Sequence, residues 1–397
     1  MEYGDGSAGL SQTVNWLGLA ALLLVQSWIS WTLLRAAGRF ASAQERWAAR
    51  AAACLLFAAV MFCYGLAFFS VARRSGLLGP VSTLLAAAAR AYLVVATVAA
   101  VVYAARSAIR KRLDADTDLH RRRALNLAAN LAMAGPFAVL AYGSLVERTD
   151  FRVRELDVPL PGLPPDLDGL RILQLSDIHL SPFLSEAELA RAIDIAAGLG
   201  PHVAVITGDL ISSPGDPLDA CIRQLARIRA DAGVFGCMGN HERYAHVEDH
   251  TARAAAAVGI RFLRGHAQPL RFGGAVLNLA GVDYQTQTGR DPYLRNAGAL
   301  VVPGACNVLL SHNPDVFPVA AAQGWNLTFS GHTHGGQVTV EILDQSLNPA
   351  RFFTPYVHGL YRLGASAVYV TRGIGAIGFP ARIGAPPEIT LLRLRKA

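Results

Sequence analysis

Five short polar blocks in the C-terminal half of the chain carry residue types that bind metal ions and move protons. The blocks are residues 176–179, 207–209, 239–242, 311–314 and 331–337. They contain two aspartates (Asp177, Asp209), one asparagine (Asn240) and five histidines (His179, His241, His312, His332, His334). Carboxylate, amide and imidazole groups together are the ligand inventory of a hydrolytic site that holds two divalent ions.

A two-metal site places specific demands on these residues. Two divalent ions ~3.5–4 Å apart can clamp the attacking and leaving oxygens of a phosphoryl transfer. Ions that close need a shared anionic ligand, and Asp209, which follows a glycine, is the candidate bridge. Asp177 and His179 can reach one ion only if the backbone bends between them. His332 and His334 stand two residues apart, so in an extended segment they point to opposite sides and can serve different ions.

The segments around the blocks predict elements that bring them together. Apolar strands are expected at 171–175, 202–207, 234–238, 307–310 and 326–329, each followed by one of the polar blocks. Helices are expected at 186–199 and 217–228, and further strands near 275–281, 366–371 and 388–394. Strands that alternate with helices indicate a largely parallel sheet, whose ligands bind beyond the carboxyl ends of the strands. We therefore expect an α/β domain with two packed sheets and a single crevice.

The order of the blocks resembles the signature of the calcineurin-like metallophosphoesterase superfamily, which reads D-x-H, G-D, G-N-H-[DE], a lone His and G-H-x-H. The resemblance covers roughly residues 150–397. Residues 373–375 and 385–389 are similar to the C-terminal signature of the bacterial YkuE/YaeI-like subgroup. The resemblance implies an α/β/β/α sandwich and a phosphoesterase activity. The chain has His202 where many relatives have an aspartate, at a position outside the metal set.

The same resemblance implies roles for individual residues. One ion would be held by Asp177, His179, Asp209 and His334, and the second by Asp209, Asn240, His312 and His332. His241 would not bind metal but would face the leaving group and protonate it or donate a hydrogen bond to it. A hydroxide bridging the ions would attack phosphorus in line. Mixed nitrogen and oxygen ligands are compatible with Mn, Fe, Zn or Mg, so the identity of the ions stays open.

The N-terminal part of the chain has a different composition. The whole chain is 52% hydrophobic and only 16% charged, and its mean hydropathy is +0.32. Four apolar stretches, at 13–34, 51–71, 84–105 and 124–146, precede the polar blocks. Each has about 21–23 residues, enough to cross a ~30 Å hydrocarbon core. We predict an all-α transmembrane bundle of about four helices in residues 1–146, a linker and edge hairpin in 147–169, and the phosphoesterase domain in 170–397.

Basic residues near these stretches predict how the chain lies in the membrane. Eleven Lys and Arg residues lie in the first and third connecting segments, against two in the second and none before the first stretch. Such an excess marks cytoplasmic loops, which would leave the catalytic domain outside the cytoplasmic membrane. The net charge of +7 is explained by these loops, and no nucleic-acid-binding motif accompanies it. The alternative is a soluble helical domain, and one stretch fewer would invert the sidedness.

The expected function is that of a membrane-anchored di-metal phosphoesterase acting on a phosphate ester, with the bilayer as its other partner. One alternative is a pyrophosphatase acting on a lipid or sugar-nucleotide diphosphate at the membrane. Another is a non-catalytic membrane scaffold, although such proteins usually lose a ligand or the leaving-group histidine. Substrate specificity is expected in the loops 211–217, 283–300 and 341–361, because loops on a rigid scaffold carry recognition.

Overall fold

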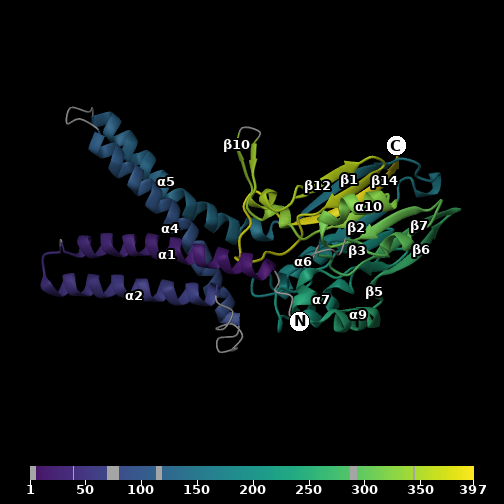
Figure 1. Cartoon of the computed structure of the whole chain (residues 1–397), viewed down its shortest axis with the longest axis horizontal. Helices are drawn as coiled ribbons and strands as arrows, with labels where there is room; N and C mark the ends of the chain where they lie inside the picture. The colour runs from purple at the N-terminus through teal and green to yellow at the C-terminus, as the bar shows by residue number, and fades with distance from the viewer. Residues whose placement is uncertain (1–5, 39, 69–79, 113–118, 287–292, 343–344) are drawn as a thin grey trace. The chain divides into compact units, whose positions relative to one another are not determined.

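The computed structural model describes residues 6–38, 40–68, 80–112, 119–286, 293–342 and 345–397 (Figure 1). The chain forms two compact units, Met1–Ala141 and Tyr142–Ala397. The division falls near the domain boundary expected after residue 146, and that boundary itself stays a prediction.

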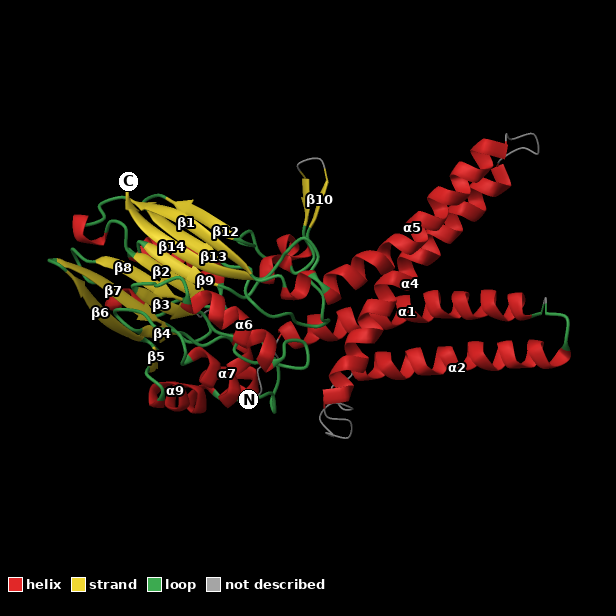
Figure 2. Cartoon of the chain, turned by 180° about the vertical axis from the view of Figure 1, so that it is seen from behind, coloured by secondary structure: helices red, strands yellow, loops and turns green. Residues whose placement is uncertain are grey.

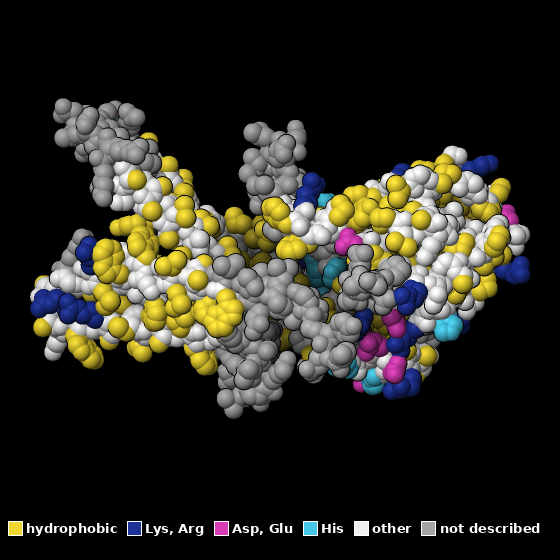
Figure 3. Space-filling view, in the orientation of Figure 1, with side chains coloured by type: hydrophobic (Ala, Val, Ile, Leu, Met, Phe, Trp, Pro, Cys, Tyr) yellow, Lys and Arg dark blue, Asp and Glu magenta, His cyan; other side chains and the backbone are white. Residues whose placement is uncertain are grey.

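The first unit consists of long helices, and each of the four apolar stretches falls largely within one of them. The helices are α1 (Gly6–Ala37), α2 (Ala43–Phe68), α4 (Pro80–Arg112) and α5 (Leu119–Leu145, whose last turn belongs to the second unit). Leu22, Val60 and Tyr64 form a small buried cluster among the first helices. Figure 3 shows hydrophobic side chains exposed along this unit, as expected for helices surrounded by lipid.

Two helices in the described part of the chain are long and apolar enough to cross a membrane, at Ala43–Gly65 and Thr83–Ala108. In α1 the corresponding apolar stretch is shorter, Leu19–Arg35. Helix α5 has three consecutive arginines near its start and carries two asparagines and Pro136, which reduce its hydropathy. A membrane-associated helical unit is therefore supported, while the expected bundle of four spanning helices is not established.

The second unit is built on two six-stranded mixed sheets (Figure 2). The first has the order β1-β14-β2-β3-β4-β5, with β1 (Arg152–Leu160), β14 (Glu388–Lys396), β2 (Arg171–Leu175), β3 (Val203–Ile206), β4 (Val234–Gly236) and β5 (Ile260–Phe262). Strands β2 to β5 are mutually parallel. The first three polar blocks follow β2, β3 and β4, so their positions at one edge of this sheet agree with the prediction.

The second sheet has the order β12-β13-β9-β8-β7-β6. Its strands are β12 (Gly359–Leu363), β13 (Ser366–Val370), β9 (Leu327–Ser330), β8 (Cys306–Leu310), β7 (Ala275–Gly281) and β6 (His266–Phe272). The four central strands are parallel and the two edge strands antiparallel to them. The last two polar blocks follow β8 and β9. A short separate hairpin is formed by β10 (Val340–Ile342) and β11 (Gln345–Leu347).

The hydrophobic core of this unit lies between the sheets, with a layer of helices outside each. Ile172, Val205, Leu277 and Phe329 are among the fully or nearly fully buried side chains that fill the space between the sheets. Helices α6 (Glu186–Ala197), α7 (Leu218–Leu225) and α9 (Glu248–Ala257) cover the first sheet, and α10 (Phe317–Gln323) packs on the second. The short helix α8 (Asn240–Ala245) carries the third polar block. The layers fit an α/β metallophosphoesterase sandwich.

The expected edge hairpin in residues 147–169 is wrong. Its strand β1 does lie at the edge of the first sheet, but it pairs along its whole length with β14, in parallel. The proline-rich segment after it forms a turn and a short 3-10 helix, Pro165–Leu167, because prolines at 159, 161, 164 and 165 remove the backbone donors that a returning strand would need. The partner strand comes instead from the C-terminus, which no local pattern indicates.

Candidate metal centre

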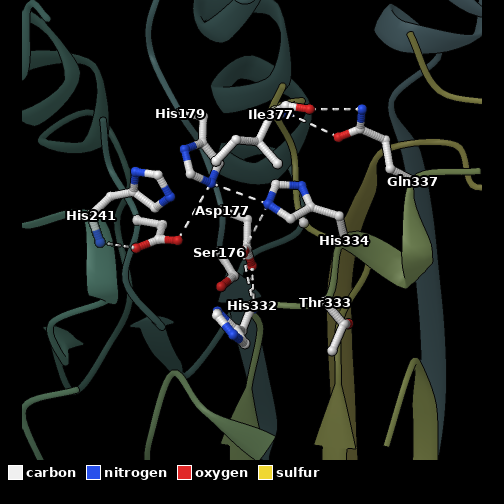
Figure 4. Close-up of polar contacts among 12 residues, drawn as sticks. Ser176, Asp177, His179, His241, His332, Thr333, His334, Gln337 and Ile377 are labelled. Atoms are coloured by element: carbon white, nitrogen blue, oxygen red, sulfur yellow. Dashed lines mark hydrogen bonds and ion pairs between the residues drawn. The ribbon is translucent and has the colours of Figure 1, made fainter. Parts of the chain in front are cut away.

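In the first group of predicted ligands, Asp177, His179 and His334 offer ligand atoms that all lie within 4.8 Å of one another (Figure 4). The Nε2 atoms of His179 and His334 lie 3.1 Å apart. His334 Nε2 lies 3.4 Å from an oxygen of Asp177, and His179 Nε2 lies 3.4 Å from an oxygen of Asp209. All four side chains are buried. The four residues that the family pattern assigns to one ion are thus brought together.

The second group adjoins the first through Asp209. An oxygen of Asp209 lies 3.1 Å from His312 Nε2. His332 Nδ1 lies 3.3 Å from His312 Nε2 and 2.9 Å from the amide oxygen of Asn240. The sets expected to hold two ions therefore share only Asp209, which is the position required of a bridging carboxylate.

The donor atoms fit metal binding better than hydrogen bonding among themselves. Two nitrogens bound to one ion at ~2.0–2.1 Å stand roughly 3.0–3.4 Å apart, which matches the His179–His334 and His312–His332 separations of 3.1 and 3.3 Å. Further out, His312 Nδ1 lies 2.6 Å from the Thr207 carbonyl oxygen. Donation of the Nδ1 proton to that carbonyl leaves Nε2 as a free lone pair, as a metal ligand requires.

Backbone conformation explains how closely spaced residues converge. Five predicted ligands adopt left-handed φ angles: Asp177 (49°), His179 (48°), Asp209 (56°), His332 (74°) and His334 (53°). This conformation costs on the order of 1–3 kcal/mol for a non-glycine residue and is found where function demands it. The bend needed between Asp177 and His179 is present. The extended conformation assumed for residues 332–334 is wrong, although the two histidines do reach the two different groups.

Electrostatics within the two groups favour a bound cation. Burial lowers the pKa of His312, but the adjacent carboxylate of Asp209 raises it more, to about 10. For Asp209 burial acts in the opposite direction and raises the pKa, but the neighbouring His312 and His179 hold it well below the usual value for an aspartate. Burial raises the pKa of Asp177. The buried carboxylates thus favour the protonated form of His312. A bound divalent ion can supply this positive charge instead.

His241 lies beside the first group but is oriented differently. Its backbone N–H donates to Asp209 (2.9 Å), and its ring Nδ1 lies 2.6 Å from the Ser212 carbonyl oxygen. The ring meets the His179 ring edge-on, with centroids 4.7 Å apart. Burial lowers the pKa of His241 to about 4. The imidazole is therefore neutral at pH 7, and the tautomer with its proton on Nδ1 donates to the Ser212 carbonyl and leaves a lone pair on Nε2.

Glu242 is a positioning residue whose role sequence reasoning missed. Its buried carboxylate accepts backbone N–H groups from Asp209 (2.9 Å), Leu210 (2.6 Å) and Gly239 (2.8 Å). These bonds tie the second polar block to the third. The acidic residue at the end of the G-N-H-[DE] motif was the available signal, but nothing in the spacing showed that it binds backbone rather than metal.

Two further residues beside the ligands were also missed. Ser212 accepts from His241 through its carbonyl, and its hydroxyl lies 3.1 Å from His179 Nδ1. Tyr284 packs its ring against His312 and His332, with centroid distances of 5.9 and 5.6 Å. Both stand in loops where specificity was expected, but neither has a sequence pattern that singles it out.

Arg382 lies fully buried behind the first group. Its guanidinium donates to the carbonyls of Gly375 (2.8 Å) and Ala385 (3.1 Å) and lies 3.4 Å from His334 Nδ1. Burial lowers its pKa to about 10, so the side chain remains charged at neutral pH. No ion pair with a carboxylate is found for it among the described residues, which makes Arg382 a buried cation held by backbone dipoles.

Other polar residues of this unit also have structural partners. His202, immediately before β3, accepts the backbone N–H of Arg171 at the start of β2 (2.9 Å) and is thus a hydrogen-bonded structural histidine. Arg372 bonds His358 (3.0 Å), and Arg243 donates to the Tyr284 carbonyl (3.4 Å). Tyr244 packs its ring 5.8 Å from that of His241, which places it beside the site.

The profile of the calcineurin-like phosphoesterase family matches residues 170–336, which include all seven proposed ligands and His241. This part of the chain is therefore a domain of the calcineurin-like metallophosphoesterase family. Its members act as hydrolases on phosphoric esters, and a dinuclear divalent metal centre is the family's site, consistent with the clustered histidines and aspartates described above.

Relatives among known proteins support the same family. The chain is 34% identical over 277 residues to the zebrafish (Danio rerio) "Transmembrane protein with metallophosphoesterase domain", covering 66% of this chain and 61% of the relative. It is 29% identical to YkuE, an uncharacterised metallophosphoesterase of Bacillus subtilis, covering 68% and 93% of the two chains. It is 28% identical to the Escherichia coli "Phosphodiesterase YaeI", covering 56% and 82%. The matched part thus spans less than two thirds of the zebrafish relative.

Proposed function

We propose that this protein is a membrane-anchored, di-metal phosphoesterase whose catalytic unit lies outside the cytoplasm. The observation that carries the activity is the pair of ligand groups that meet at Asp209, with His241 beside them. Retention of every predicted ligand and of His241 argues against a scaffold that has lost its chemistry.

The residues would divide the work as follows. Asp177, His179, Asp209 and His334 would hold one ion, and Asp209, Asn240, His312 and His332 the other. Two bound ions would supply positive charge to the phosphoryl oxygens and acidify the attacking water. A phosphate ester brings negative charge next to His241, which raises the pKa of the ring. His241, protonated at Nε2 in the complex, would then give its proton to the departing oxygen as the phosphorus–oxygen bond breaks.

Substitutions at the shared ligand and at a ligand of the second ion test this activity. We expect Asp209→Ala and Asn240→Ala to abolish metal-dependent hydrolysis of p-nitrophenyl phosphate esters by the purified full chain, and to lower the bound metal below two ions per chain. His266→Gln, at an exposed histidine outside the site, is the matched control and should change neither. Retained hydrolysis in both alanine variants would contradict the mechanism.

The extracytoplasmic location rests on the basic residues of the connecting segments and on an even number of crossings. The transmembrane name of the zebrafish relative and the two membrane-capable helices support membrane association. A reporter joined after Ala397 tests sidedness. We expect alkaline phosphatase fused there to be active and green fluorescent protein to be dark, whereas the opposite pattern would place the catalytic unit in the cytoplasm.

A further inference from the structure

A pair of consecutive phenylalanines stands out on the surface of the catalytic unit. Phe352 is 90% exposed and Phe353 is 83% exposed, and Arg351 beside them is also exposed. No other large hydrophobic side chain in the described part of Tyr142–Ala397 is as exposed. Isolated exposed hydrophobic residues are ordinary. Two neighbouring phenylalanines held almost wholly in solvent carry a cost that a binding partner would remove.

Buried polar contacts on either side of the phenylalanine pair join its loop to the segments that carry the proposed ligands. On one side, Asn348 donates to the Gly335 carbonyl (2.7 Å), one residue after the proposed ligand His334. On the other, Thr354 donates to Asp315 (2.6 Å), three residues after the proposed ligand His312. Asn348 and Thr354 are themselves buried. Residues 348–354, which we term the aromatic loop, therefore form a braced projection beside both ligand groups.

The conformation of the aromatic loop is fixed by local hydrogen bonds and packing. Its 3-10 helix, η6 (Pro349–Phe352), begins with Asn348 as a cap, whose side chain accepts the Ala350 N–H. Asn348 also fills the space beside Gly336, where any Cβ would overlap its amide. The cap and the Thr354–Asp315 bond leave the two phenylalanines pointing outward from a fixed base.

We propose that the aromatic loop dips into the lipid surface, and that the substrate of the site is a phosphate ester carried by a membrane lipid. The inference rests on the proposed function. The same polypeptide can be attached to a bilayer, because two of its helices are apolar and long enough to span one. Aromatic side chains favour the boundary between headgroups and hydrocarbon, and an adjacent arginine complements anionic headgroups. The phosphate of a lipid held there would face the two ligand groups.

A matched pair of substrates tests this inference with the full chain in lipid nanodiscs. Hexadecyl p-nitrophenyl phosphate partitions into the bilayer, whereas ethyl p-nitrophenyl phosphate stays in water, and both release the same leaving group. We expect the double variant Phe352→Ser/Phe353→Ser to lower kcat/KM for the hexadecyl ester by about tenfold or more, and to change that for the ethyl ester less than about twofold. The double tryptophan variant should restore the hexadecyl activity, because tryptophan is also favoured at the interface.

Controls separate the possible outcomes. Leu363→Ser removes an exposed hydrophobic side chain (49% exposed) at the end of β12, and should alter neither activity. If the wild type hydrolyses neither ester, the proposed function fails. If both esters are affected equally by the serine pair, or neither is, the lipid inference fails while the phosphoesterase activity stands.

Photolabelling gives a readout independent of activity. A diazirine-bearing phospholipid in the nanodisc should label peptides of residues 348–354 as well as peptides of α2 and α4, and the serine pair should remove only the former. Labelling of the helices without the loop would overturn the inference. Crosslinks from the loop to a second copy of the chain would assign the phenylalanines to a protein interface instead.

Discussion

Glu242 and Asp209 are joined by a hydrogen bond from the Asp209 backbone N–H to the Glu242 carboxylate, 2.9 Å long. The same carboxylate binds the N–H groups of Leu210 and Gly239. Asp209 stands at a φ of 56°, a conformation that does not persist without support. Glu242 therefore holds the shared ligand in its strained position from outside the metal groups.

We predict that Glu242→Gln lowers metal affinity or kcat/KM by about 10–100-fold, the usual effect of removing a partner that supports a ligand. The amide keeps the size of the side chain but offers one acceptor oxygen instead of two, so at least one buried N–H loses its partner. Metal content after dialysis against a weak chelator is the measurement. Glu186→Gln, at an exposed position, should behave as wild type, and an unchanged metal content in Glu242→Gln would contradict the assignment.

Two glycines with nearly equal φ angles separate backbone strain from crowding at the site. Gly208 has a φ of 88° and Gly259 a φ of 85°. A Cβ at Gly259 meets no atom within 4 Å, whereas one at Gly208 would lie 2.5 Å from the Gly239 nitrogen and 2.9 Å from His312 Nδ1. We expect Gly259→Ala to cost about 1–2 kcal/mol of unfolding free energy from the left-handed backbone alone.

For Gly208→Ala we expect about 1–3 kcal/mol more, from overpacking against backbone that cannot move aside. Thermal unfolding followed by tryptophan fluorescence measures both variants. Displacement of His312 should also reduce metal binding in Gly208→Ala but not in Gly259→Ala. Equal stability losses in the two variants would show that the contact with Gly239 is relieved without cost.

His312 should couple metal binding to pH. Its pKa of about 10 in the metal-free protein means that the ring is protonated at pH 7.5, whereas a ligand nitrogen must be free of its proton. A proton competes with the ion, so apparent metal affinity should rise as pH rises toward about 10. Calorimetric titrations in two buffers with different ionisation enthalpies should reveal about one proton released per chain. In His312→Gln this release should disappear, and in His266→Gln it should persist.

Much of the catalytic fold was predictable because the apolar runs are short and each ends at a polar block. The strand expected at 171–175 is β2, with the same bounds, and those near 275–281 and 307–310 agree with β7 and β8 within one residue. The residues that meet at the metal centre were also predicted, because parallel strands deliver their carboxyl ends to one edge. The ligand roles drawn from the family pattern stay predictions until a metal is measured.

Other features depend on contacts between distant residues and left no periodic signal. The pairing of β1 with β14 joins the beginning of the catalytic unit to the end of the chain. The left-handed conformation of His332 and His334 depends on tertiary contacts, since histidine is found at positive φ more often than most residues but does not select it by itself. Tyr284 reaches His312 from a loop with no recognisable motif. The number of membrane crossings stays a prediction, because the arginines, asparagines and proline of α5 lower its hydropathy.

Arg382 provides the last test, because it connects a proposed ligand to the rest of the unit. Its guanidinium donates to the Gly375 and Ala385 carbonyls and lies next to His334, and its backbone N–H donates to the carbonyl of Gly143 in the last turn of α5 (3.1 Å). We predict that Arg382→Lys weakens Mn²⁺ binding by about 10–100-fold, because an ammonium cannot reach all three partners in one plane. Arg382→Met should weaken Mn²⁺ binding more strongly, since it leaves buried carbonyls unpaired.

Manganese titration followed by electron paramagnetic resonance measures the binding of Mn²⁺ to these variants, with Arg362→Met, at an exposed position, as the control. Because Arg382 acts through His334, tight binding should be lost for one ion and kept for the other, and the equal loss of both would refute a positioning role.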